Sequence, residues 1–129
     1  MQDYSPDYFE KIEKAAMAGD TAAMLRLSIL LLGIPGSPVK RDPVAAVRWL
    51  RRAVDEGGHA YAMELLGMEA ESRAKQNPEA SAEATMWYAR ALEAYDRDIQ
   101  LGVAGARENA DGLRRRLAKK GSYPSPGTT

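Results

Sequence analysis

The residue types that most often perform chemistry are few in this sequence and stand apart from one another. His59 is the only histidine and cysteine is absent, so no disulfide, thiolate zinc site or cysteine nucleophile can form. Histidine is the side chain that changes charge near neutral pH, but no second ligand stands at metal-binding spacing from His59. We therefore expect a structural role for His59 at the start of a helix, and no metal or cofactor.

Paired carboxylates are the next candidates, because glycosidases use two of them. Glu64, Glu69 and Glu71 fall within one expected helix, in which Glu69 and Glu71 do not share a face. We expect these carboxylates to belong to a solvated helix face. The same interpretation applies to Asp96 and Asp98.

Nucleophilic and phosphate-binding motifs are incomplete. No base is evident for Ser28, Ser72 or Ser81, so a Ser-His-Asp arrangement is not predicted. Gly57-Gly58 follows no expected strand and precedes no Lys-Ser/Thr pair, both of which a phosphate-binding loop requires. The sequence therefore predicts that this protein is not an enzyme.

Composition argues against two further kinds of partner. The 129 residues include 18 Lys and Arg and 18 Asp and Glu, a formal net charge of zero, whereas nucleic-acid-binding domains normally carry a basic excess. The longest apolar run, residues 29–32, is far shorter than the about 20 residues of a membrane span. Residues 1–4 show no basic segment followed by an apolar one. We expect no nucleic acid, no membrane insertion and a cytoplasmic location by default, or a periplasmic one if a leader was removed.

Proline and glycine divide the chain into six expected helices, because Ser or Asp followed by Pro starts a helix and Gly ends one. The expected helices cover residues 6–18, 21–32, 43–56, 59–75, 79–101 and 103–119. Short and long connections alternate, which predicts three antiparallel helix pairs. Residues 1–120 are expected to form a single domain, and the Gly/Ser/Pro/Thr-rich residues 121–129 a flexible tail.

The helix pairs carry an internal repeat. Gly19, Gly58 and Gly102 stand at the corners of the three pairs, 39 and 44 residues apart. Glycine can take the positive φ that an abrupt reversal between two helices demands. We therefore interpret these three glycines as structural corner positions.

The first helices of the second and third pairs repeat one aromatic pattern. Ala46-Trp49-Leu50-Ala53 matches Ala84-Trp87-Tyr88-Ala91 at identical spacing, and offsets of three, four and seven residues share one helix face. We expect Trp49, Trp87 and Tyr88 to be equivalent buried anchors of the fold, and Tyr61 also to lie in the core.

The second repeat carries a recognisable motif. Residues 39–53 read VKRDPVAAVRWLRRA, and Gly58-His59-Ala60 and Leu66-Gly67 follow. The segment resembles the Sel-1-like repeat (SLR) family of tetratricopeptide-like (TPR-like) helical repeats, over about residues 6–119, with repeats at about 6–33, 42–75 and 79–119. Leu50 departs from the family's usual aromatic, and the third repeat lacks Leu-Gly. The resemblance implies a short right-handed α-solenoid, whose concave face is lined mainly by the first helix of each pair.

The polar side of these first helices is the candidate binding surface. Arginine beside aromatic residues is typical of interface hot spots, and the alternative is a solvated repeat face. The candidate partner-binding residues are Arg48, Arg51, Arg52, Arg90, Glu93 and Tyr95. A second basic cluster, residues 114–120, is expected to complement the dipole of the last helix, with a contact surface for an acidic partner as the alternative.

These observations favour a non-catalytic module that binds another protein, as a monomer or weak dimer. Stand-alone proteins of the SLR family serve in bacteria as adaptors or as immunity proteins. The resemblance therefore implies that the partner is a cognate toxin, an effector or a signalling component. The alternative is a structural or regulatory subunit that self-associates through an end of the solenoid.

Overall fold

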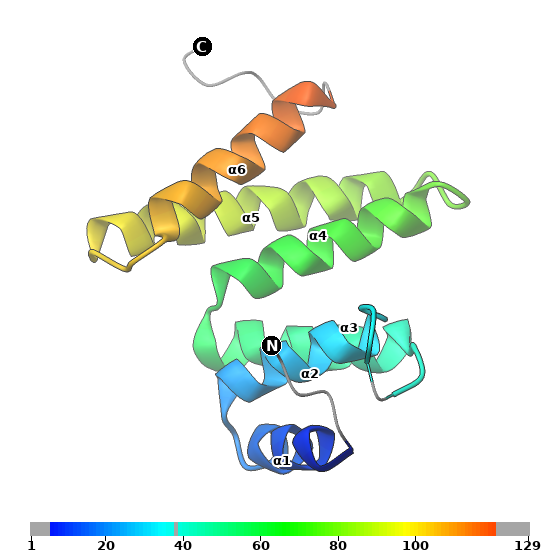
Figure 1. The fold of residues 1–129 in the computed structure, drawn as a ribbon. Coiled ribbons are helices and arrows are strands. Elements are labelled where there is room, and N and C mark those ends of the chain that lie inside the picture. Colours follow the sequence, from blue (N-terminus) through cyan, green and yellow to red (C-terminus); the bar gives the residue numbers. More distant parts are fainter. Residues whose placement is uncertain (1–5, 38, 121–129) are drawn as a thin grey trace.

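The computed structural model describes residues 6–37 and 39–120 and shows an all-helical chain over this part. The six helices are α1 (Pro6–Met17), α2 (Thr21–Leu31), α3 (Pro43–Gly57), α4 (Ala60–Ala74), α5 (Ala80–Gln100) and α6 (Ala106–Lys119) (Figure 1). The expected all-α class and the six helices are thereby confirmed. The tail expected over residues 121–129 lies outside the described residues.

Local sequence signals explain where most helices begin and end. An Asp20 carboxylate oxygen accepts a hydrogen bond from the Ala23 N–H at 3.1 Å, and Asp42 accepts one from the Ala45 N–H at the same distance. Both are N-cap bonds, which satisfy a backbone donor that has no partner within the helix. α6 begins three residues later than expected because Gly105 has φ +80°, outside the helical region.

The three corner glycines all take positive φ, at +103° for Gly19, +61° for Gly58 and +78° for Gly102. The Gly58 N–H also donates to the carbonyl oxygen of Val54 at 2.8 Å, which closes the last turn of α3. The chain can therefore reverse sharply between α3 and α4 without strain.

The helices pack chiefly with their neighbours in sequence, α1 with α2, α2 with α3, and so on to α6. In Figure 1, α1 at the foot is seen nearly end-on, α2 to α5 run across the view, and α6 slants over α5 at the top. The right-handed solenoid implied by the SLR resemblance is a finer statement about this arrangement, and it stays a prediction.

The core is built from alanines between larger aliphatic side chains. Eleven buried alanines belong to one hydrophobic cluster, and its fully buried large side chains include Met24, Leu27, Leu50, Leu66, Leu113 and Leu117. Small side chains let helix backbones approach closely. One close approach is at Gly67, where an added Cβ would stand only 2.6 Å from the Tyr88 ring, so the present packing of α4 against this ring requires glycine at position 67.

The two tryptophans of the repeat are not equivalent. Trp87 and its neighbour Tyr88 are buried, but Trp49 is only partly buried at the edge of the core. The reason is that Ala46, Leu50 and Ala53 form the centre of the buried face of α3 and are fully buried. The prediction of equivalent anchors is therefore wrong for Trp49. Tyr61 is also exposed rather than in the core.

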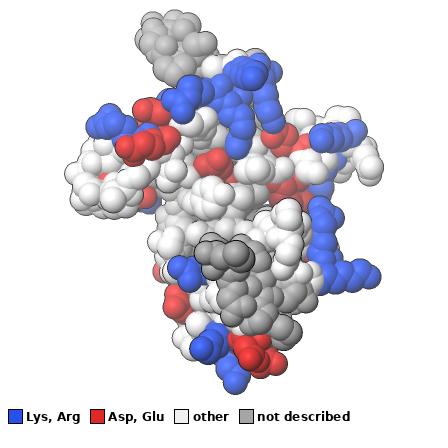
Figure 2. All heavy atoms as spheres, in the orientation of Figure 1, with Lys and Arg blue, Asp and Glu red and all other residues white. Residues whose placement is uncertain are grey.

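The basic C-terminal cluster is largely used within the fold. Figure 2 shows Lys and Arg side chains gathered over α6 at the top of the molecule. Arg114 pairs with Asp96 at 2.9 Å and Lys120 with Glu71 at 2.7 Å. Arg116 pairs with Glu64 at 3.3 Å. These pairs connect α6 to α4 and α5, so most of this charge stabilises the position of α6.

Candidate protein-binding groove

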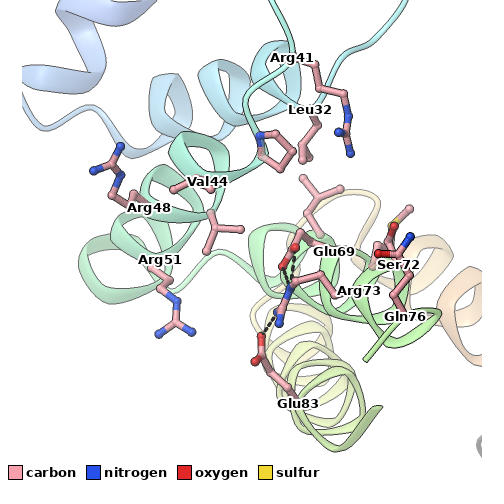
Figure 3. Close-up of a pocket in the computed structure, with 14 residues that line it drawn as sticks. Leu32, Arg41, Val44, Arg48, Arg51, Glu69, Ser72, Arg73, Gln76 and Glu83 are labelled. Carbon is pink, nitrogen blue, oxygen red and sulfur yellow. Dashed lines mark hydrogen bonds and ion pairs between the residues drawn. The ribbon is translucent and has the colours of Figure 1, made fainter. Parts of the chain in front are cut away.

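An open groove of about 860 Å³ lies between α3 and α4 (Figure 3). Its lining comes from α3 residues up to Arg51, from α4 residues from Leu65 onward and Gln76 after them, from Leu32 and Arg41 before α3, and from Glu83 of α5. The groove thus occupies the end of the helix pair that lies away from the Gly57-Gly58 corner. We call this feature the α3–α4 groove.

The floor of the α3–α4 groove is apolar. It is formed by Leu32, Pro43, Val44, Val47, Leu65 and Met68. Val44 exposes 69% of its surface and Met68 exposes 41%. Apolar surface left in water gains free energy when a partner covers it, and grooves of this composition are frequent interaction sites.

The α3 side of the groove carries positive charge without a balancing carboxylate. Arg41 precedes α3, and Arg48 and Arg51 lie on it; all three are exposed and line the groove. Among the described residues, none of these guanidinium groups forms an ion pair. Their hydrogen-bonding capacity is therefore available to a partner.

The opposite side of the groove is internally neutralised. Arg73 of α4 lies between Glu69 and Glu83, with 2.7 Å from its Nε to the nearer Glu69 oxygen and a short contact from its Nη2 to Glu83 (Figure 3). The hydrogen bond to Glu69 raises the pKa of Arg73, against the opposing effect of burial. Two carboxylates against one guanidinium make this side weakly acidic, so the two sides of the groove differ in charge.

The Trp87 ring connects the groove to the surface of α5. The guanidinium carbon of Arg51 lies 5.7 Å from the ring centroid and that of Arg90 lies 4.8 Å from it, within the range of cation–π attraction. Trp87 is 4% exposed, and its buried indole N–H has no acceptor in the described part of the chain. Arg51 of α3 and Arg90 of α5 thus both contact one buried ring.

The structure places the predicted binding residues in different surroundings. Arg48 and Arg51 line the α3–α4 groove, and Arg90 shares the Trp87 ring with Arg51 but does not line the groove. Arg52 is exposed but engaged elsewhere: it pairs with Glu56 at 2.8 Å and lies 5.1 Å from the Trp49 ring centroid. Glu93 is exposed on α5 and is not part of the groove lining.

Tyr95 is buried, so its assignment to an exposed binding surface is wrong. The side chain is 2% exposed, and its hydroxyl donates a hydrogen bond of 2.8 Å to Glu64. Glu64 is itself buried rather than part of a solvated face. Burial and the bond to Glu64 raise the pKa of Tyr95. A sequence signal existed, because Tyr95 continues the spacing of Ala84, Tyr88 and Ala91 along one helix face.

Several groove residues were not predicted, among them Arg41, Val44, Met68, Arg73 and Glu83. Only Val44 had a sequence signal. It is an apolar residue four positions before Arg48, on a helix face that is otherwise polar. Arg41 lies in the segment before α3, and Met68, Arg73 and Glu83 belong to α4 and α5, which approach α3 only through the tertiary packing. No local pattern could have joined them.

Metal binding, the single histidine and membrane crossing complete the description of residues 6–37 and 39–120. No three His, Asp or Glu side chains lie close enough there to hold a metal ion. His59 contacts Thr21 at 2.8 Å between Nε2 and the hydroxyl oxygen, so it joins the beginnings of α4 and α2. No helix in this part of the chain is long and apolar enough to cross a membrane.

Comparisons of the chain with protein-family models, with curated proteins and with solved structures found no significant match. The resemblance to Sel-1-like repeats therefore stays a prediction from the residues that carry it.

Proposed function

We propose that this protein is a non-catalytic interaction module that holds a segment of another protein in the α3–α4 groove. The observation that carries the proposal is the combination of a widely exposed apolar floor with arginines along one side that form no ion pair among the described residues. Val44 and Met68 supply the apolar part, and Arg48 and Arg51 the charged part. Interfaces commonly combine apolar contact area with arginine.

The position of the groove on helices supports this function. Most of its lining residues stand on α3 and α4, whose backbone hydrogen bonds fix their positions before any partner arrives. A preformed site lowers the entropy lost on association. A right-handed solenoid of three antiparallel helix pairs is the finer architecture that fits this role, and an adaptor or a toxin-neutralising immunity protein is the kind of module that the SLR resemblance implies.

A site-specific crosslinking experiment tests this function. A photoreactive amino acid replaces Val44 in the groove or, as a control, Met17 at the end of α1, whose exposure of 68% matches the 69% of Val44. In cells that naturally produce the protein, we expect a defined adduct from position 44 and not from position 17. The crosslinked protein is then identified by mass spectrometry and its binding reproduced with purified components. Equal adducts from both positions, or none from position 44, contradict the proposal.

Self-association is the second candidate function, and one surface favours it. Tyr61, Leu101 and Val103 are exposed, and Tyr61 and Val103 line a smaller hollow of about 260 Å³ beside the α3–α4 corner. Association through this surface would cover it. Light scattering over a range of micromolar concentrations tests the idea, because a constant monomer mass counts against it and a rising mass that Leu101→Lys abolishes supports it.

A further inference from the structure

We propose that the segment bound in the α3–α4 groove is an acidic amphipathic helix, whose carboxylates face the α3 side and whose apolar side chains cover the floor. This inference rests on the proposed function and adds the chemistry and the orientation of the partner. It follows from the difference in charge between the two sides of the groove, from the shape of the lining and from the spacing of the arginines.

Charge decides which side of the partner faces α3. Arg41, Arg48 and Arg51 have no ion-pair partner in the described part of the chain, whereas Arg73 on the opposite side is held by two glutamates. A carboxylate brought to the α3 side forms charge-assisted hydrogen bonds with an arginine that has none. On the opposite side it would meet Glu69 and Glu83 and be repelled. A basic segment would have to approach in the unfavourable field of the three arginines.

The spacing of the arginines favours several carboxylates over one phosphate. In Figure 3, Arg41 lies at one end of the groove, and Arg48 and Arg51 extend from α3 in different directions at the other. A phosphate group needs donors that converge on one point, whereas acidic residues distributed along a helix can meet separated guanidinium groups. Among the described residues that line the groove, none is aromatic, so they offer no stacking surface of the kind that a single-stranded nucleic acid uses.

The lining favours a helix over an extended strand. The described residues contain no strand, so an added extended segment would find no sheet edge to satisfy its backbone groups. A helix satisfies these groups internally and presents apolar side chains at every third or fourth position. At about 1.5 Å per residue, the α3 residues 43–51 and the α4 residues 65–73 that line the groove each extend over about 12 Å. The groove thus fits about two helical turns.

A peptide library with two possible charges tests this partner chemistry on the full chain. The probe is a displayed 16-residue helix with leucine fixed along one stripe, in which every position on either flank of the stripe is Glu or Lys. We expect selection to enrich Glu on one flank, the flank that faces α3, and to leave the other flank less biased. Enrichment of Lys, or of neither residue, overturns the inference.

Charge-reversal variants of the protein and of the peptide then test whether the peptide binds at α3. We expect the double variant Arg48→Glu/Arg51→Glu to bind the enriched peptide with a Kd about tenfold higher or more. A second peptide, in which Lys replaces each Glu, should bind this variant better than it binds the original protein. The matched control is Arg115→Glu/Lys119→Glu on α6, whose exposed side chains form no ion pair within residues 6–37 and 39–120. Equal loss in both variants, or no rescue, contradicts the assigned orientation. Circular dichroism verifies that each variant remains helical.

The outcomes distinguish this inference from the function on which it rests. If position 44 crosslinks a partner whose bound segment is basic or uncharged, the interaction function stands and the acidic chemistry is wrong. If position 44 traps no partner and the library shows no enrichment, both are wrong. If position 44 crosslinks a second copy of this chain, the groove is a self-association surface and the proposed partner is replaced.

Discussion

The Tyr95 hydroxyl donates a hydrogen bond of 2.8 Å to the buried carboxylate of Glu64, and this bond joins α5 to α4 inside the molecule. The second Glu64 oxygen accepts from Arg116 of α6 at 3.3 Å. One buried carboxylate is therefore shared by three helices. A buried charge is tolerated only when it is paired and hydrogen-bonded, so this contact fixes the helices relative to one another.

Replacing Tyr95 by Phe should destabilise the fold although the ring remains. The substitution leaves one oxygen of a buried carboxylate without its donor, which costs about 1–3 kcal/mol of the free energy of unfolding. Urea denaturation followed by circular dichroism measures the change. Tyr61→Phe is the control, because Tyr61 is exposed and should change stability by less than about 0.5 kcal/mol. Equal effects in the two variants would show that the Glu64 contact is energetically unimportant.

Replacing Gly67 by Ala should destabilise the contact between α4 and α5. The added Cβ would stand 2.6 Å and 2.7 Å from two carbons of the Tyr88 ring, so the ring or the helix must move, at a cost of about 1–3 kcal/mol. Gly112→Ala in α6 is the matched control, since its nearest neighbour to an added Cβ is an Arg115 nitrogen at 3.9 Å. There the better helix propensity of alanine should stabilise by up to about 1 kcal/mol. Melting temperatures should therefore shift in opposite directions.

Truncating the two tryptophans should have unequal effects. Trp87→Ala removes a buried indole and should cost about 3–5 kcal/mol, whereas Trp49→Ala removes a partly buried ring at the edge of the core and should cost clearly less. Chemical denaturation of both variants under one set of conditions provides the comparison. An equal or larger loss for Trp49 would mean that the ring is more deeply packed than the structure shows.

Stability should fall in acid partly through Glu71. Burial alone would raise the pKa of Glu71, but hydrogen bonds from Lys120 and Tyr88 and the charges of Lys120 and Arg116 lower it overall. Because the folded pKa is lowered, the contribution to stability is present above the unfolded pKa and is lost as pH falls through the folded value. The loss should begin near pH 5 and continue below about pH 4.

Glu71→Gln provides the measurement for this pH dependence. The variant lacks the titrating carboxylate, so the difference in unfolding free energy between it and the original protein should shrink as pH falls from 7 to 3. Glu108→Gln on α6 is the control, because Glu108 is exposed and forms no ion pair within residues 6–37 and 39–120. A constant difference between Glu71→Gln and the original protein across this range contradicts the assigned role.

The helices were predictable because their signals are local. Asp42 and Pro43 together start α3, and Gly58 ends it with positive φ; each acts over a few neighbouring residues. The same reasoning placed Arg48 and Arg51 on an exposed helix face, where the structure also has them. Tyr95 was assigned to the wrong side because the helix was expected to extend beyond the repeat pattern, whereas its packing against α4 continues to that position.

The sequence by itself determined the six helices, the positions of the corners and the alanine-rich faces, because capping groups, prolines, glycines and helical periodicity act within one or two turns. Only the tertiary structure decided that Trp87 is buried while Trp49 is not, and that Tyr95 meets Glu64. It also brought Val44 and Met68 into one groove. These outcomes depend on how helices that are distant in sequence are rotated and spaced relative to one another. Many core side chains determine this arrangement together, so no single sequence pattern predicts it.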